Sequence, residues 1–229
     1  MGFDSCFSEK CKERVENYMD FTITANQSYM VIMMLRDLQA NKNEIINISP
    51  AFYQTVFRNC MQALFVDISK MFDDNSKNLS IVWLMNIISS HMDLLDNRAV
   101  SVNVFQHLGD HSAEGVYFSS LEDLVNHYKE SIENCKNDIE SLMTLRNKFY
   151  AHLDRKAQNH LDKLFKDYSV SLVKIEKLLT LNVNISNALY MYFTDGTVFP
   201  LTTNYDDLYR TISCIEKYDV LSKKYHDYI

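Results

Sequence analysis

The chain has 229 residues, of which 47% are hydrophobic and 23% charged, and its formal net charge at pH 7 is -7. This composition is typical of a globular protein, and the negative charge argues against sequence-independent wrapping of nucleic acid, which needs an extended basic surface. A small basic site remains compatible with an acidic body, because a local positive field can still recruit a phosphate.

Glycine and proline are scarce, with four Gly and two Pro in the whole chain. Because these residues mark turns, their scarcity favours long helices joined by few tight turns. No internal repeat, low-complexity stretch or Ser/Gly-rich linker divides the sequence. We therefore expect an all-α bundle of long antiparallel helices in a single domain, residues 1–229.

The first half of the chain predicts three helices. Residues 10–41 form the first, an N-terminal helix that becomes apolar towards its end. The second covers residues 51–72, where Pro50 stands at an early helical position at which its missing N–H costs nothing. Ser80 then precedes an apolar third helix over residues 81–95.

The second half opens with a predicted loop over residues 96–120, followed by a long amphipathic helix over residues 120–152. Ser120 and the acidic pair that follows it are typical of a helix start. The last predicted segments are a fifth helix from near residue 157 to about 193, an alternative short hairpin over residues 190–199 around Asp-Gly, and a C-terminal helix over about 205–226.

The cysteines predict reduced thiols in a cytoplasmic protein, because they are odd in number and the N-terminal segment is too polar for a secretory signal. Cys6 and Cys11 lack the nearby partners of a zinc site, and we expect neither a metal nor a cofactor. Two acid–histidine groups are interpreted as solvated surface or loop residues, namely His91 with Asp93, and His107 with Asp110 and His111.

The stretch LRNKFYAHLDRK is the most distinctive local feature. From Arg146 to Lys156 it holds four Lys or Arg against one acid, Asp154, inside an acidic chain. On an ideal helix Arg146 and His152 lie about 120° apart in azimuth and about 9 Å apart along the axis. They can act together where the helix breaks between them, or where two copies face each other across a dimer axis.

The residue types in this stretch suit phosphodiester cleavage without a metal. His152 titrates near neutral pH and can exchange a proton with a ribose 2′-OH or a leaving oxygen. The guanidinium of Arg146 matches the charge that builds on phosphorus. The alternative is structural, since Lys and Arg favour the last turn of a helix, where they complement its dipole.

Two segments resemble a known family. LRNKFYAHLD resembles the R-x(4–6)-H motif of the HEPN superfamily, with Asn147 as the polar residue after the Arg. FYQTVFRNCMQALFVDISKMFDDNSKNLSIVWLMNII is similar to the paired helices of the AbiU-like abortive-infection branch, in which an aromatic-led helix ends in an [ML]FD turn before a Ser-led apolar helix. The likeness covers roughly residues 50–177, the core of the expected HEPN-type bundle, to which the N- and C-terminal helices are additions.

The resemblance implies a metal-independent endoribonuclease that acts as a homodimer on RNA, in phage defence or as a toxin with a cognate antitoxin. Arg146 would then stabilise the phosphate, His152 would be the general acid or base, and Asn147 would orient one of them. Neighbouring residues are added as RNA-binding candidates by proximity: Lys148, Tyr150, Asp154, Arg155 and Lys156.

One departure from the family bears on regulation. A branch controlled by an antitoxin places a Tyr two residues after the His, and Asp154 stands there in this chain. The alternatives to a nuclease are a catalytically inactive HEPN-fold module that dimerises or holds a partner, and a nucleotide-binding domain.

Overall fold

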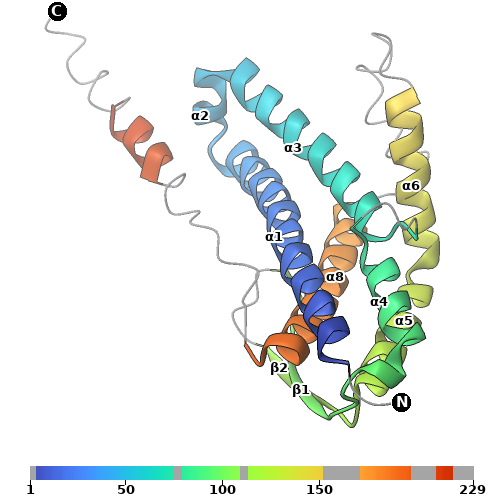
Figure 1. Ribbon diagram of the computed structural model, residues 1–229. Coiled ribbons are helices and arrows are strands. Elements are labelled where there is room, and N and C mark those ends of the chain that lie inside the picture. Colours follow the sequence, from blue (N-terminus) through green and yellow to red (C-terminus); the bar gives the residue numbers. More distant parts are fainter. Residues whose placement is uncertain (1–3, 75–78, 109–112, 152–170, 197–209, 219–229) are drawn as a thin grey trace, which may run out of the picture. The chain divides into compact units, whose positions relative to one another are not determined.

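Helices make up most of the described chain, as Figure 1 shows. The computed structural model describes residues 4–74, 79–108, 113–151, 171–196 and 210–218. The prediction of an all-α fold is confirmed, with one small β-hairpin added. The helices are α1 (Ser5–Asn41), α2 (Asn43–Ile48), α3 (Pro50–Met71), α4 (Ile81–Ser90), the 3-10 turn η1 (Met92–Leu94), α5 (Leu121–Asn134), α6 (Lys136–Ala151) and α8 (Leu172–Thr194); residues 210–218 are also helical.

Helix starts follow the capping residues in the sequence. As predicted, α3 begins at Pro50, and α4 and α5 follow Ser80 and Ser120. The Ser120 hydroxyl accepts a hydrogen bond from the Asp123 backbone N–H at 3.0 Å. In return the Asp123 carboxylate accepts one from the backbone N–H of Ser119 at 3.1 Å. The first bond satisfies an N–H group that a helix start leaves without a partner, and the second fixes the residue before the cap.

The chain separates into two compact units, one made of Met1–Asn26 with Ala63–Leu201 and the other of Gln27–Gln62 with Thr202–Ile229. The division falls inside α1 and α3, so each of these helices contributes to both units. The organisation of the whole chain as a single domain stays a prediction.

In the first unit, α8 is buried on nearly every side. A helix start that was not predicted lies at Ser171. This residue has an extended backbone, and its hydroxyl accepts a hydrogen bond from the Lys174 N–H. The helix ends at Thr194, and the next residue, Asp195, has a positive φ of 53° in the left-handed region, just before Gly196. The alternative prediction of a hairpin over residues 190–199 is therefore wrong for residues 190–194, which are helical. The Asp-Gly pair follows the end of a helix. The predicted fifth-helix residues before 171 lie outside the described residues.

Polar residues inside α8 bond to the first part of α1. The Tyr18 hydroxyl donates to the side-chain oxygen of Asn182, and the Asn182 amide donates to Thr22 at 2.9 Å. The Thr22 hydroxyl also lies 3.1 Å from that of Ser186. Because all four side chains are buried, these bonds remove a desolvation cost that unpaired polar groups would impose.

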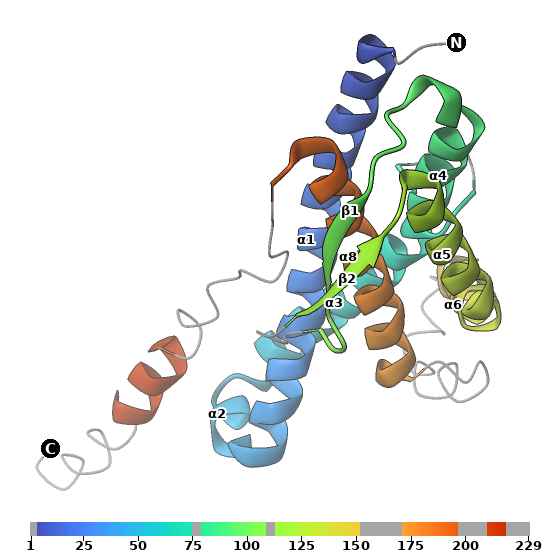
Figure 2. The same cartoon turned by 90° about the horizontal axis from the view of Figure 1, so that it is seen from below.

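A two-stranded antiparallel hairpin, β1 (Val100–Val104) with β2 (Glu114–Phe118), occupies part of the predicted loop over residues 96–120. That prediction is wrong for these strands. Two buried asparagines of α8 hold the outer edge of β1. Asn184 accepts from the Phe105 N–H at 2.9 Å and donates to the Phe105 carbonyl at 3.0 Å, and Asn187 donates to the Asn103 carbonyl at 3.0 Å. Figure 2 shows the hairpin lying along α8.

The long helix predicted over residues 120–152 is interrupted once. Cys135 leaves the helical conformation, with φ -100° and ψ 3°, and separates α5 from α6. Its side chain is only 5% exposed. The break therefore falls at a buried position of the amphipathic stripe, which the sequence periodicity alone does not reveal.

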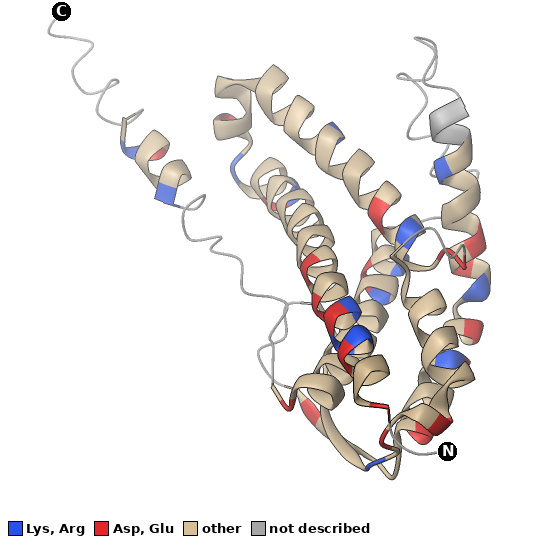
Figure 3. Cartoon of the chain, in the orientation of Figure 1, with Lys and Arg blue, Asp and Glu red and all other residues tan. Residues whose placement is uncertain are grey.

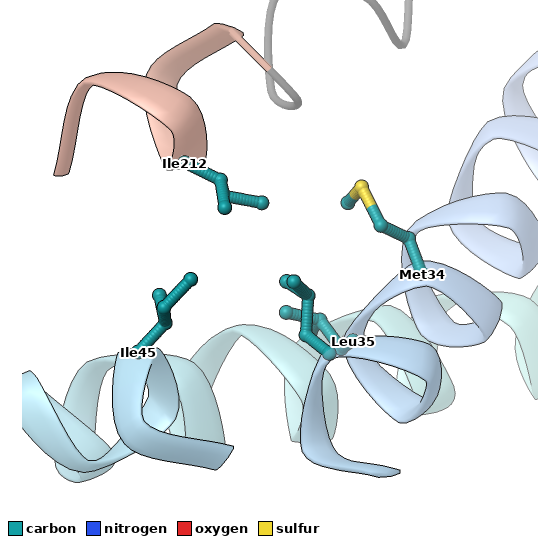
Figure 4. Close-up of a cluster of buried hydrophobic side chains, with 5 residues drawn as sticks. Met34, Leu35, Ile45 and Ile212 are labelled. Carbon is teal, nitrogen blue, oxygen red and sulfur yellow. The ribbon is translucent and has the colours of Figure 1, made fainter. Parts of the chain in front are cut away.

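The second unit has its own small core. Four labelled side chains, from α1, α2 and the helical segment 210–218, point toward one another in Figure 4: Met34, Leu35, Ile45 and Ile212. Leu38 completes the cluster. A salt bridge of 2.8 Å between Lys42 and Glu216 ties the same segments at the surface. Residues 210–218 confirm the middle of the predicted C-terminal helix, and the rest of that prediction lies outside the described residues.

Candidate active site

The described part of the basic motif lies at the C-terminal end of α6. Leu142 and Leu145 are each only 2% exposed and face the core of the first unit. Arg146 follows directly and is half-buried, while Asn147 is exposed. The buried leucines thus fix the last turns of the helix and place the Arg–Asn pair at its surface.

Arg146 and Asn147 are hydrogen-bonded to each other. The side-chain oxygen of Asn147 accepts from Nε of Arg146 at 3.2 Å and from Nη2 at 3.0 Å. Adjacent residues on a helix do not face each other, so this contact depends on the length of the arginine side chain. Both bonds lie on one edge of the guanidinium, and with the described residues Arg146 makes no further hydrogen bond, which leaves the other N–H donors available to an anion.

The helix is continuous from Arg146 to Ala151. Lys148 and Tyr150 therefore lie on α6, although their side-chain positions are outside the described part. His152 and the remaining candidates, Asp154, Arg155 and Lys156, lie outside the described residues. Of the predicted catalytic residues, the structure thus brings Arg146 and Asn147 together.

The start of α6 is fixed to α8 by charge. The carboxylate of Asp138 lies 2.9 Å from Nζ of Lys174 and 4.0 Å from Nζ of Lys177. Its side chain is 20% exposed, so water screens this pair less than a fully exposed one. These positioning residues were not predicted from the sequence. The one local sign of them is the acid in the first turn of α6.

Acidic and basic residues are interspersed along α5 and α6, as Figure 3 shows. Lys136, for example, pairs with Glu133 at 2.9 Å near the break between the two helices. The described part of this pair of helices therefore carries mixed charge rather than a continuous basic stripe. A nucleic-acid contact on it would be local, close to Arg146.

Two of the other sequence candidates, His91 and Cys11, have structural surroundings. Nδ1 of His91 lies 3.0 Å from the Ile87 carbonyl, at the end of α4. Cys11 is buried, and burial raises the pKa of its thiol to about 11, so the reactive thiolate is scarce. Within the described ranges, no three His, Cys, Asp or Glu side chains come together in a metal-binding arrangement.

Comparison with protein families gives one match. The family model described as AbiU2, of the HEPN type, matches residues 8–211. The chain belongs to the AbiU2 family. The match extends the likeness over residues 50–177 in both directions, so that it includes most of α1 and reaches into the helical segment 210–218. This AbiU2 protein is thus a HEPN-like protein of the abortive-infection type.

Two further comparisons found nothing: neither a curated protein nor a solved structure matches this AbiU2 chain. Among the described helices, none combines the length and the apolar character needed to cross a bilayer.

Proposed function

We propose that this AbiU2 protein is a metal-independent endoribonuclease that acts in phage defence or as a toxin with a cognate antitoxin. Its residues would be Arg146 as the phosphate-stabilising cation, His152 as the general acid or base, and Asn147 as the group that orients Arg146. The observation that carries the proposal is the pair of hydrogen bonds that fixes the Arg146 guanidinium at the end of α6.

A fixed guanidinium is what such a reaction needs. During attack by a ribose 2′-OH, negative charge builds on the oxygens around phosphorus, and a cation that is already oriented stabilises it without reorganisation. Asn147 binds the edge formed by Nε and Nη2, so the opposite end of the guanidinium can meet a phosphate. RNA brings its own nucleophile, and a histidine supplies the proton transfer.

The continuity of α6 also supports a homodimer. Because residues 146–151 are helical, no helix break between Arg146 and Ala151 can bring the guanidinium round to the position of His152. Placing the motifs of two copies against each other across a two-fold axis combines the two groups without any such break. We therefore propose that the cleft is built from two copies.

The decisive experiment is RNA cleavage in the presence of EDTA, with wild type compared with Arg146→Ala and His152→Ala. Attack by the 2′-OH leaves a 2′,3′-cyclic phosphate, so we expect such ends on the products and no cutting at a 2′-deoxy position. Lys136→Ala, at the other end of α6, is the matched control and should cut like wild type.

Intact RNA after incubation with folded wild-type protein would sink the nuclease proposal. Binding of nucleotides without cleavage would indicate the nucleotide-binding alternative. A dimer that neither cuts RNA nor binds nucleotides would indicate a dimerisation or partner-binding module. A monomer at micromolar concentration by light scattering would contradict the two-copy cleft.

A further inference from the structure

The two outer edges of the β1–β2 hairpin differ in the hydrogen-bond partners of their backbone groups. On β1, the outward-facing carbonyl of Asn103 and both backbone groups of Phe105 are bonded by Asn187 and Asn184 of α8. On β2, the described residues provide no such cover. An open strand edge is a template for another strand.

The pairing register identifies the open groups on β2. Since the Asn103 carbonyl points to α8, alternate β1 residues point away from β2, and their partners across the pair point away from β1. Asn103 pairs with Gly115 and Ser101 pairs with Tyr117. The N–H and C=O groups of Gly115 and Tyr117 therefore face outward. Next along this edge, the N–H of Ser119 bonds to Asp123, as the same alternation requires.

We propose that the β2 edge pairs with β2 of a second copy of this chain, antiparallel and centred on Val116. In this register Gly115 of one copy lies opposite Tyr117 of the other, and the reverse holds by symmetry. Both are outward-facing residues, so each pair exchanges two backbone hydrogen bonds. The edge is thus complementary to itself, which a two-fold contact requires.

The side chains also fit a second copy. A Cβ added to Gly115 would meet nothing within 4 Å, so nothing described in its own chain requires a glycine there. Tyr117, by contrast, is 68% exposed. Across the proposed pair, the ring of Tyr117 covers the backbone of Gly115 of the second copy. Glycine in a strand is typical of a site that another group approaches closely.

The charges are compatible with this register. The one charged residue of β2, Glu114, lies opposite Phe118 of the second copy and not opposite its own symmetry mate. The ring of Phe118 packs against His127, with centroids 5.3 Å apart. The strand also lacks the lysine or proline with which exposed edges are commonly protected.

The proposed contact is separate from the Arg146 site. Figure 1 shows α6 leading away from the hairpin, and from Leu121 to Arg146 the two helices span roughly 40 Å at about 1.5 Å per residue. The inference therefore does not rest on the proposed nuclease function. If both two-fold contacts form, the assembly exceeds a dimer, either as a closed tetramer or as a chain of dimers.

Disulfide trapping tests the register. In a background in which the exposed cysteines Cys6 and Cys214 are changed to serine, Val116→Cys should cross-link to itself under mild oxidation, because the two copies meet at residue 116. Ser101→Cys is the matched control. It lies opposite Tyr117 on the same hairpin, but in the proposed contact two further strands separate it from residue 101 of the second copy. Cross-linking of Val116→Cys no faster than Ser101→Cys would overturn the proposal.

A second pair of variants keeps the test valid if the cysteine disturbs the hairpin. In Gly115→Val the new side chain fits the open space of its own chain, and valine favours strands, so the melting temperature should stay the same. Self-association, measured by sedimentation, should weaken at least tenfold. Tyr117→Lys should weaken association similarly, and Ser101→Lys should not. Unchanged association in both β2 variants would rule out this edge as the contact.

Discussion

The interior of α8 and the end of α6 use the same side chain for different purposes. Asn182 is fully buried and bonds to Tyr18 and Thr22 within the first unit. Asn147 is exposed and bonds to Arg146. In the interior no water replaces a lost partner, so the amide there contributes to stability. At the surface water competes, so the amide contributes little to stability and chiefly fixes the direction of a cation.

The largest expected effect belongs to the cation of the surface pair. We predict that Arg146→Ala lowers the rate of RNA cleavage by about 10²–10³-fold, the usual effect of removing one donor to a developing oxyanion. The free energy of unfolding should change by no more than about 0.5 kcal/mol, because the side chain is only half-buried. Single-turnover cleavage measures the predicted loss of rate, and urea unfolding measures the predicted change in stability.

Arg146→Lys is the informative companion of this variant. It keeps the positive charge but loses the fork that contacts both Asn147 and a phosphate, so most of the rate should stay lost. Full activity in Arg146→Lys would mean that charge alone matters and that the orientation by Asn147 is irrelevant.

The interior pair should respond in the opposite way. Asn182→Ala removes the acceptor of the Tyr18 O–H and one hydrogen bond of Thr22, and it also opens a cavity. We predict a loss of about 2–4 kcal/mol in the free energy of unfolding. The cleavage rate per folded molecule should not change. A stability close to wild type in urea unfolding would contradict the structural role given to this network.

Asn147→Ala tests the surface amide directly. Without its acceptor, the Arg146 guanidinium samples several orientations, and we predict a drop in cleavage rate of about tenfold, which corresponds to about 1.4 kcal/mol of transition-state stabilisation. Thr144→Ala, another exposed position on α6, serves as the control. Equal rates for these two variants would remove the orienting role from Asn147.

The sequence predicts the helix starts well because capping is local. Ser80 and Ser120 accept from backbone N–H groups three residues further on, and Pro50 suits the first helical position by its own geometry, so the sequence alone contains the signal. The hairpin is different, since its outer edge is held by Asn184 and Asn187, some 80 residues away in the chain. No local pattern states that two polar residues of a helix will be buried against a strand.

The candidate site divides in the same way. The resemblance to the HEPN motif singled out Arg146 and Asn147, which are adjacent in sequence and in contact in the structure. The ion pair between Asp138 and Lys174, which positions α6, joins two helices and was not predictable from spacing. Local chemistry can be inferred from a motif, whereas the parts that position it come from tertiary packing.

The smallest effect is expected from Tyr18→Phe, which removes one donor from the interior network but keeps the ring. At pH 7 we predict a loss of about 1 kcal/mol in the free energy of unfolding. Burial raises the pKa of the Tyr18 phenol well above its usual value, so in the folded protein it stays protonated in alkaline solution. In the unfolded chain it ionises near its ordinary pKa of about 10.

This difference gives the variant a pH signature. Above about pH 10 the unfolded state of wild type releases a proton that the folded state retains, so Tyr18 lowers stability by up to about 1.4 kcal/mol per pH unit. Other buried tyrosines, such as Tyr128, act equally in both proteins and cancel. The phenylalanine variant should therefore be less stable at pH 7 and match wild type near pH 11. A stability difference that stays constant across this range in urea unfolding would show that Tyr18 ionises as readily in the folded protein as in the unfolded chain.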